Sequence, residues 1–446
     1  KKKIREKEIK KGEKMSERFE TIIIGGGLSG LSAGIELAKS GKECVIFERG
    51  EESGSKNVIG GVLYAAPLFK ILPDFVKEAP WERYVKKRIF AFVSKEKSVF
   101  ITFDSEKWGK EPYYNYSFTV LRAKFDKWLS QKYEELGGLL LSGAKVEDFI
   151  WEGTKIIGVR TLVGPNEEEV MGDNFIIAEG ANPFLAFKAD LADKRYAEDF
   201  VIAVKEVLKL SEEEINKRFN LTEREGIAIE IFGEFTEGIL GSGFIYTNRD
   251  TLSIGAGAKI EELREKGLNP NDLLENMKNI PEIKKWIEGA EIMEYEAHLI
   301  PEYGIKRRSP LVRDNVAVIG DAAGFVNVSI FHEGTNLAVE SGRLVAEAIK
   351  EGNLKNYEKK LKKSWIWKDL EKTKGFMDYL KRNKDIIYDL PFRFIEIVEE
   401  MFTIEPDKPK TIKRNKYWQI LTKEKGIVSF LTNSVKGLKM LFKYFV

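Results

Sequence analysis

Three glycines near the start of the chain have the spacing of a phosphate-binding turn. Gly25, Gly27 and Gly30 form the pattern G-x-G-x-x-G directly after the apolar run 21–24. In such a turn the first glycine allows a sharp bend, the second lets backbone approach a pyrophosphate, and the third lets the following helix pack closely. The positive end of that helix then faces the phosphates. The pattern predicts a dinucleotide site on a strand, a glycine loop and a helix.

Residues on either side of this turn complete the candidate site. Leu28 and Ser29 begin the predicted helix, and Glu48 ends the next predicted strand, 43–48, with Arg49 after it. An acid at that strand end can hydrogen-bond a ribose hydroxyl. The simpler alternative is an ordinary strand–helix–strand turn with a surface glutamate. Because all three elements occur in order, we favour cofactor binding.

A second candidate loop follows a buried strand far along the chain. Gly320 and Asp321 begin the run Gly-Asp-Ala-Ala-Gly at the end of the apolar segment 316–320. A carboxylate followed by small residues suits a polar sugar chain and its phosphates. Alone, this run would be read as a strand-to-turn junction capped by aspartate. Its occurrence after a dinucleotide turn favours the cofactor interpretation.

A helix is predicted to begin shortly afterwards, at Gly334, Thr335 and Asn336. The free N–H groups and positive dipole end of such a helix can stabilise negative charge on a bound cofactor. His332 precedes this helix and is a candidate acid–base group. The other histidine, His298, is interpreted as a hydrogen-bonded structural residue, which is also the alternative for His332.

Two further motifs place polar groups on the same predicted fold. Arg122 begins a helix predicted over 120–137 and can reach a phosphate or a ribose, although a surface arginine explains it almost as well. Glu179 and Gly180 form an acid–glycine pair at the end of the apolar strand 175–178. Both motifs are therefore candidates for cofactor binding.

The elements that carry these motifs are far apart in the sequence, so the dinucleotide fold must be assembled from separate pieces. Alternating apolar patterns between them, with a hairpin signal at 248–250, predict an inserted antiparallel sheet. The resulting division is a basic tail at 1–14, a dinucleotide domain in three parts (15–75, 111–188 and 306–352), a substrate domain in two parts (76–110 and 189–305), and a helical C-terminal region at 353–446.

Composition excludes several classes of function. The single cysteine, Cys44, cannot hold an iron–sulfur cluster, which needs four thiolates, and two histidines make a zinc site improbable, so we predict no metal. A net charge of +2 gives no field to gather nucleic acid. No apolar run spans a bilayer and no secretory signal is seen, so we expect a cytoplasmic protein. The 32% of charged residues fits a thermophile.

Together these motifs resemble the flavoproteins that include p-hydroxybenzoate hydroxylase and geranylgeranyl reductases. Within that group the run 54–61, which contains Lys56, Asn57, Gly60 and Gly61, resembles the G-x-K-N-x-x-G-G loop of FixC-type proteins, also called EtfC. These are electron-transfer-flavoprotein:quinone oxidoreductase-like subunits. The resemblance implies an α/β fold, with a Rossmann-like FAD-binding domain of the p-hydroxybenzoate hydroxylase type, an inserted antiparallel sheet and a helical C-terminal region.

The resemblance also implies a function and partners. FAD would take electrons from an electron-transfer flavoprotein and pass them to a quinone, with Lys56, Asn57 and His332 acting near the ring. Because this chain cannot hold an iron–sulfur cluster, a small separate ferredoxin-like protein would carry one. Both a simple relay and a place in an electron-bifurcating complex fit. The family often has aspartate where Glu179 stands, which leaves that contact open.

Three other functions remain as alternatives. A prenyl-lipid reductase would carry a tyrosine–tryptophan–phenylalanine–proline strand motif, which the corresponding segment 244–248 lacks. A hydroxylase is the second alternative, while a halogenase is disfavoured by the absence of its tryptophan motif. The third is a non-catalytic scaffold that keeps FAD for structure, which no electron donor would bleach.

The last segment, 426–446, has the pattern of a basic amphipathic helix. Its apolar residues cluster on one side of a helical wheel, and Lys436, Lys439 and Lys443 gather on the other. Such helices lie in the interface of a membrane. A quinone is dissolved in lipid, so we expect peripheral association with the cytoplasmic membrane. The alternative is that the apolar face packs on the helical region 353–400.

Overall fold

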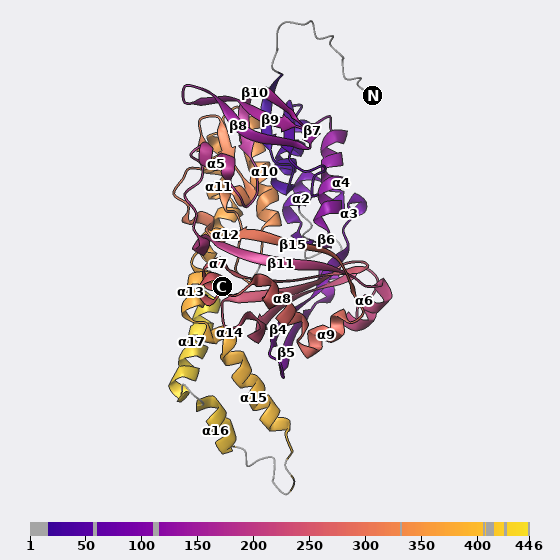
Figure 1. Ribbon diagram of the computed structural model, residues 1–446, viewed down its shortest axis with the longest axis vertical. Helices are drawn as coiled ribbons and strands as arrows, with labels where there is room; N and C mark the ends of the chain where they lie inside the picture. Colours follow the sequence, from indigo (N-terminus) through magenta and orange to yellow (C-terminus); the bar gives the residue numbers. More distant parts are fainter. Residues whose placement is uncertain are drawn as a thin grey trace.

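The computed structural model describes residues 17–56, 60–109, 116–330, 332–404, 406, 414–422 and 426–444. Asn57 and the predicted basic tail lie outside these residues. Figure 1 shows three tiers: a sheet with its helices at the top, a second sheet in the middle and a helical arm at the bottom. The mixed α/β class, with two sheets and a helical C-terminal region, is confirmed.

The first sheet is built around parallel strands whose apolar residues are buried on both faces. Its order is β16-β17-β10-β1-β2-β7, and β8 and β9 form an antiparallel extension from β10. The strands are β1 (Arg18–Ile24), β2 (Cys44–Glu48), β7 (Leu139–Ser142), β8 (Ala144–Glu152), β9 (Lys155–Val163), β10 (Asn166–Ile177), β16 (Val312–Arg313) and β17 (Val316–Val318). Because β1, β10 and β17 are parallel neighbours, the loops after them open at one edge of the sheet.

Helices pack on this sheet and against one another. They are α1 (Leu28–Lys39), α2 (Ala66–Ile71), α3 (Phe75–Glu78), α4 (Arg122–Glu135), α5 (Phe184–Lys188), α10 (Thr335–Lys350) and α11 (Asn356–Lys363). A Cβ at Gly342 of α10 would overlap the carbonyl oxygen of Ser29, so glycine is what lets α10 lie directly on α1. This contact fixes the start of α10 relative to the glycine turn.

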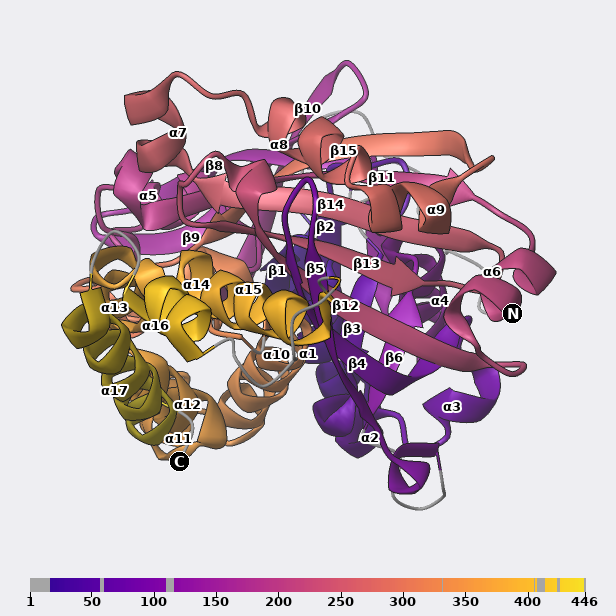
Figure 2. The ribbon, with the colours of Figure 1, turned by 90° about the horizontal axis from the view of Figure 1, so that it is seen from below.

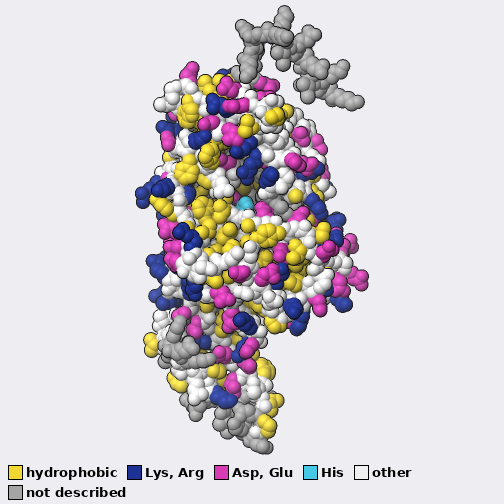
Figure 3. All heavy atoms as spheres, viewed as in Figure 1, with side chains coloured by type: hydrophobic (Ala, Val, Ile, Leu, Met, Phe, Trp, Pro, Cys, Tyr) yellow, Lys and Arg dark blue, Asp and Glu magenta, His cyan; other side chains and the backbone are white. Residues whose placement is uncertain are grey.

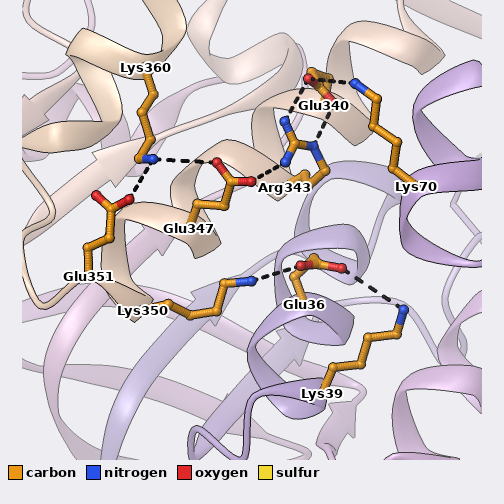
Figure 4. Close-up of polar contacts among 9 residues, drawn as sticks. All are labelled: Glu36, Lys39, Lys70, Glu340, Arg343, Glu347, Lys350, Glu351 and Lys360. Atoms are coloured by element: carbon orange, nitrogen blue, oxygen red, sulfur yellow. Dashed lines mark hydrogen bonds and ion pairs between the residues drawn. The ribbon is translucent and has the colours of Figure 1, made fainter.

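An ion-pair network joins these helices (Figure 4). Arg343 pairs with Glu340 at 2.8 Å, and Glu340 also contacts Lys70 of α2 at 3.4 Å. Glu347, Lys360 and Glu351 extend this network. A separate cluster pairs Glu36 of α1 with Lys39 and with Lys350 of α10. Networks of this kind stabilise more than isolated surface pairs do.

The second sheet has the order β15-β11-β14-β13-β12-β4-β6-β3, with β5 beside β4. Its strands are β3 (Gly61–Tyr64), β4 (Arg83–Val93), β5 (Ser98–Asp104), β6 (Ser117–Val120), β11 (Phe200–Lys209), β12 (Glu225–Gly233), β13 (Gly241–Thr247), β14 (Thr251–Lys259) and β15 (Glu291–Pro301). The segments 61–64 and 117–120 fall within the dinucleotide domain of the sequence division, yet they pair with this sheet. Strand pairing depends on which sheet edge is adjacent, which sequence does not reveal.

The two faces of the second sheet differ in chemistry. On β12, Ile227, Ile229 and Ile231 belong to an apolar core that includes Leu273 and Met277 of a covering helix. The alternate residues occupy the opposite face because side chains alternate along a strand. The covering elements are α6 (Glu212–Phe219), α7 (Ile260–Lys266), α8 (Pro270–Lys278) and α9 (Pro281–Ile287).

The remaining chain forms helices that end in the arm. They are α12 (Trp365–Thr373), α13 (Phe376–Arg382), α14 (Asp385–Tyr388), α15 (Leu390–Phe402), α16 (Arg414–Thr422) and α17 (Gly426–Tyr444). A small core of Phe376, Leu380, Ile387 and Tyr444 with Leu240 attaches this region to the second sheet. The helices α15, α16 and α17 lie together (Figure 2).

Candidate functional site

The glycine turn between β1 and α1 has the shape that a pyrophosphate requires. Gly25 has φ +111°, and a Cβ there would overlap the carbonyl oxygen of Ala178 on the neighbouring strand. A Cβ at Gly30 would overlap the carbonyl oxygen of Gly25, so the helix approaches the turn too closely for any side chain. A Cβ at Gly27, in contrast, would meet nothing within 4 Å. The turn is therefore tight on the protein side and open on the side where a ligand would lie.

Glu48, the acid predicted to bind a ribose, lies beside this turn. Glu48 accepts hydrogen bonds from the backbone N–H of Gly26 at 2.8 Å and of Gly50 at 2.6 Å. These bonds fix the carboxylate beside the glycine loop, where it can meet the sugar of a bound dinucleotide. Arg49 is exposed next to it.

The second predicted loop lies against the first. The 3-10 turn Gly320–Ala323 follows β17, and a Cβ at Gly320 would stand 2.7 Å from Ser29 Oγ. Asp321 is partly exposed at this junction. Burial raises the pKa of Asp321 above its ordinary value, against the opposing effect of His298 and Arg122. The structure thus brings together Ser29 and Gly320, two predicted residues that are remote in sequence.

Arg122 lies near this junction, but its guanidinium is paired with a residue of its own helix, α4. Its Nε and Nη2 donate to the carboxylate of Asp126 at 2.7 Å and 2.6 Å. A Cβ at Gly54 would lie 2.7 Å from the carbonyl oxygen of Arg122, so the turn 51–56 covers the start of α4. Lys56 is exposed in that turn. Contacts of Arg122 and Lys56 with a cofactor stay predictions.

Glu179 has a structural role that sequence did not reveal. Its two carboxylate oxygens accept hydrogen bonds from the N–H groups of Leu185 at 3.0 Å and Ala186 at 2.8 Å, which caps α5. Burial raises the pKa of Glu179 to about 7, although these N–H groups act to lower it. Gly180 takes φ +79° and turns the chain away from β10. A direct contact between Glu179 and a cofactor stays a prediction.

The start of α10 points toward the second sheet. The helix begins at Thr335 after Gly334, and Thr335 Oγ1 accepts a hydrogen bond from the backbone N–H of Tyr64 on β3 at 3.4 Å. Asn336 is buried, and its Oδ1 has no hydrogen-bond partner among the described residues. The first turn of any helix also leaves backbone N–H groups without intrahelical acceptors. This end of α10 therefore offers several unmatched polar groups to a ligand.

The polar face of the second sheet was not predicted. Register places Lys205 of β11 opposite Gly255 of β14, and Gly255 opposite Phe244 of β13. Phe244 is opposite Glu230 of β12, so these residues form one row across the sheet. The two other members of the row, Glu296 of β15 and Phe90 of β4, extend it to both sides. This row runs on the face opposite the apolar core.

Lys205 is the clearest functional candidate that sequence reasoning missed. It is buried, and its Nζ donates to the carbonyl oxygen of Gly60 at 2.7 Å. Burial lowers the pKa of Lys205 to about 7, against the opposing effect of Glu296 and Glu294. A lysine inside the alternating strand 200–209 was the available signal. Its contact ties the FixC-like loop to the polar face of the sheet.

The residues present fit FAD. The open space at Gly27 suits the pyrophosphate, Glu48 the adenosine ribose, Asp321 the ribityl chain, and the start of α10 the ring. When bound, FAD supplies the redox chemistry. In this site the chain would hold FAD between the two sheets and would offer the positive end of α10 to negative charge. Among the described residues, no group of three His, Cys, Asp or Glu side chains is placed to hold a metal.

Comparisons with known proteins agree with this site. A family model described as an FAD binding domain matches residues 20–83. The chain is 38% identical to the protein FixC of Azorhizobium caulinodans over 380 residues, which cover 83% of this chain and 86% of that protein. It is 30% identical to a probable electron transfer flavoprotein-quinone oxidoreductase of Escherichia coli over 435 residues, which cover 95% and 99%.

A solved structure shares the fold. A geranylgeranyl bacteriochlorophyll reductase-like protein from Thermoplasma acidophilum aligns over 94% of this chain and 100% of its own, with a TM-score of 0.69 and 19% identity. At that identity the likeness concerns the fold alone. The sequence relatives align over most of both chains, and the family model matches an FAD binding domain. This chain therefore belongs to the FixC family and is an FAD-dependent oxidoreductase.

Proposed function

We propose that this protein takes electrons from an electron-transfer flavoprotein, through a small ferredoxin-like iron–sulfur partner, and delivers them to a quinone at a membrane surface. The name of the Escherichia coli relative supports the flavoprotein donor and the quinone acceptor. The separate iron–sulfur partner is what the resemblance to FixC-type proteins implies, and the single cysteine of this chain, which cannot hold a cluster, fits that arrangement. The membrane is supported by the C-terminal arm.

The observation that carries the proposal is the exposed apolar face of the arm. On α17, Val428 is 74% exposed, Leu431 56% and Phe442 66%, while Asn433 and Tyr444 of the same helix are buried. The usual arrangement of a surface helix is thus reversed. The other large apolar side chains exposed on the arm are Phe394, Met401, Phe402, Ile404, Trp418, Val435, Leu438 and Leu441. Hydrophobic side chains are visible at this lower end in Figure 3.

The described part of the arm therefore does not bury this face on the helices 353–400. Such a patch marks an interaction site. No described helix is long and apolar enough to cross a bilayer. The arm would instead lie on the membrane, with its apolar side chains among the headgroups and upper acyl chains.

Lysines accompany this apolar face. An open groove on α17 and α13 is lined by Val435, Leu438, Lys439, Phe442 and Lys443, with Tyr379. The sequence predicted these lysines on the side opposite the apolar residues. Lys439 and Lys443 line the same groove as the apolar residues because each directly follows an apolar residue of that face, Leu438 and Phe442. Consecutive side chains on a helix are about 100° apart, so each lysine borders the apolar face. Each lysine near an anionic surface contributes about 1 kcal/mol.

The membrane contact is tested with Leu431→Asp/Phe442→Asp, two exposed positions whose change leaves the small core of the arm intact. The matched control is Ile101→Asp on β5, where Ile101 is 46% exposed. We expect the double variant to keep FAD and its melting temperature but to lose co-sedimentation with anionic liposomes, while the control binds normally. Equal binding of all three proteins would refute the membrane contact. Truncation after Lys425 is a cruder test because it also removes buried Tyr444.

Electron entry is tested anaerobically with the holoprotein. Only one dinucleotide fingerprint is present, so NADH alone should leave the flavin oxidised. A reduced electron-transfer flavoprotein with the iron–sulfur partner should bleach it, and a long-chain quinone should restore the colour. Rapid bleaching by NADH would favour a hydroxylase or reductase, and no bleaching by any donor would favour a scaffold.

A further inference from the structure

A histidine and a glutamate from distant segments meet beside the start of α10. His332 Nδ1 lies 3.1 Å from Glu230 Oε2, with side-chain exposures of 35% and 9%. His332 has φ +45°, a conformation that costs a non-glycine residue energy unless its surroundings hold it. Here a bridge between Asn327 and Glu333 holds the loop. The loop thus presents the imidazole to one carboxylate of the sheet.

Glu230 is itself positioned by a neighbour. It lies on the polar face of the second sheet, and Tyr246 Oη donates to its Oε1 at 3.3 Å. One carboxylate oxygen therefore meets the tyrosine of β13 and the other meets His332. The stacked rings of Tyr246 and Phe244, whose centroids are 4.9 Å apart, restrict the tyrosine.

The charged and titratable groups around His332 come from several elements. Glu230 is on β12, Tyr246 on β13, Arg88 on β4, Tyr64 on β3, and Glu302 follows β15, while Glu333 is in the same loop. Burial acts to lower the pKa of His332, and the charge of Arg88 does the same. The charge and the hydrogen bond of Glu230 raise this pKa and outweigh the lowering. The net pKa of His332 therefore lies above its ordinary value, so the pair with Glu230 favours the charged form of the imidazole.

The pair lies where the flavin ring is expected. α10 contacts the first turn of α1 at Gly342, next to the glycine turn, and Gly342 follows the start of α10 at Thr335 by seven positions. At 1.5 Å per residue, the start of α10 lies about 10 Å from the pyrophosphate turn, toward the second sheet. The ribityl chain would extend in this direction. His332, just before that start, is therefore near the reacting end of FAD, and its Nε2 is the ring nitrogen that Glu230 leaves for a substrate.

We propose that Glu230 holds His332 as a charged proton donor to the quinone oxygen, with Tyr246 positioning the carboxylate. This inference rests on the proposed function. The quinone would gain two electrons and one proton from the anionic reduced flavin and a second proton from His332 Nε2. Two O–H bonds would form on the quinone, one with the proton that accompanies the two electrons and one with the proton of His332 Nε2, whose N–H bond breaks. The quinone becomes a quinol, and a proton from solvent restores the charged imidazole.

The first test is the titration of His332 by NMR in untagged holoprotein. The chain has two histidines, so the signal lost in His332→Asn identifies it. Asparagine also tolerates a positive φ, which protects the fold of this variant. Replacing Glu230 by Gln removes the charge at 3.1 Å and should lower the pKa of His332 by about one unit or more. The matched control is Glu358→Gln, an exposed pair with Lys362, which should change nothing.

The second test is quinone turnover against pH. In the wild type kcat should fall as His332 loses its proton, and in Glu230→Gln this limb should move to lower pH by the shift seen in NMR. His332→Asn should lose roughly 100-fold or more in kcat. Its FAD content and the rate of flavin reduction should stay unchanged.

The outcomes separate this inference from the proposed function. If the wild-type holoprotein reduces no quinone, the proposed function fails, and the inference with it. If it reduces quinone and His332→Asn does so equally fast, only the proton-donor role fails. A pKa of His332 that is the same in Glu230→Gln and in the wild type shows that the pair is merely a tether for the loop, which also overturns the proposal.

Discussion

The glycine turn permits a prediction in which binding and stability separate. At Gly27 a Cβ meets nothing within 4 Å, whereas at Gly30 it would overlap the Gly25 carbonyl oxygen and come within 3.3 Å of Ile23 Cγ2. Gly27 has φ −86°, which alanine adopts without strain. Gly27→Ala should therefore change the stability of the apoprotein by less than about 1 kcal/mol. Gly30→Ala should destabilise it by about 1–3 kcal/mol, because the backbone must move.

In contrast to the stability of the apoprotein, the affinity for FAD should fall in Gly27→Ala. The added methyl group occupies the space where the pyrophosphate approaches the backbone. Loss of one or two charge-assisted hydrogen bonds, at about 1.5–3 kcal/mol each, lowers the affinity for FAD about 100-fold. At free FAD equal to about 100 times the wild-type Kd, the wild type gains about 2.7 kcal/mol of stability, but Gly27→Ala gains only about 0.4 kcal/mol.

Both quantities can be measured with the same samples. Flavin fluorescence quenching gives Kd, and thermal melts with and without FAD give the stabilisation. Gly437→Ala on α17, where the nearest atom to a Cβ is 3.9 Å away, is the control for adding a methyl group. If Gly27→Ala binds FAD as tightly as the wild type, the open side of the turn does not hold the pyrophosphate and the assignment of the site is wrong.

Three further predictions concern composition, packing and pH. The isolated chain should bind one FAD and no iron, since it has one cysteine; stoichiometric iron and sulfide on this polypeptide alone would contradict this. Arg343→Met should destabilise the protein by about 3–5 kcal/mol in denaturant melts, because it deprives the buried carboxylate of Glu340 of its main partner; Lys362→Met, at an exposed pair, should cost less than about 1 kcal/mol. In the apoprotein, Lys205 has its pKa lowered from 10.5 to about 7, so the unfolded chain binds more protons between these values. The free energy of unfolding should therefore rise with pH above 7, relative to Lys205→Met, by at most about 1.4 kcal/mol per unit. Parallel pH profiles of the two proteins would show that folding does not lower the pKa of Lys205.

Local pattern was sufficient for most of the fold and for the phosphate end of the site. The elements around Gly25, Gly27 and Gly30 are short-range features in which residue type and spacing dictate a strand, a tight turn and a helix. The same holds for the strand and turn at Asp321 and for the hairpin at 248–250. In each case the physical requirement, a backbone without a Cβ or a run of apolar residues, is visible in neighbouring residues.

Tertiary structure decided which distant side chains lie together at the candidate site. Lys205 and Glu230 belong to different strands, and only the register of the second sheet places them in one row with Phe244. The sequence showed Glu179 only as an acid at a strand end, whereas the folding of α5 over that end gives its carboxylate two N–H donors.

The C-terminal arm is a second case in which the sequence alone did not determine which side chains are exposed. A helical wheel indicates that the segment 426–446 has an apolar side, but not which side meets the protein. That depends on contacts with residues far away in the chain, and in the structure Asn433 and Tyr444 of α17 turn inward, leaving Val428, Leu431 and Phe442 outside. Sequence alone therefore determined the secondary structure and the cofactor turn, because these depend on neighbouring residues. Only the folded chain decided which charged and apolar side chains lie together and which are exposed, because those positions are set by distant contacts.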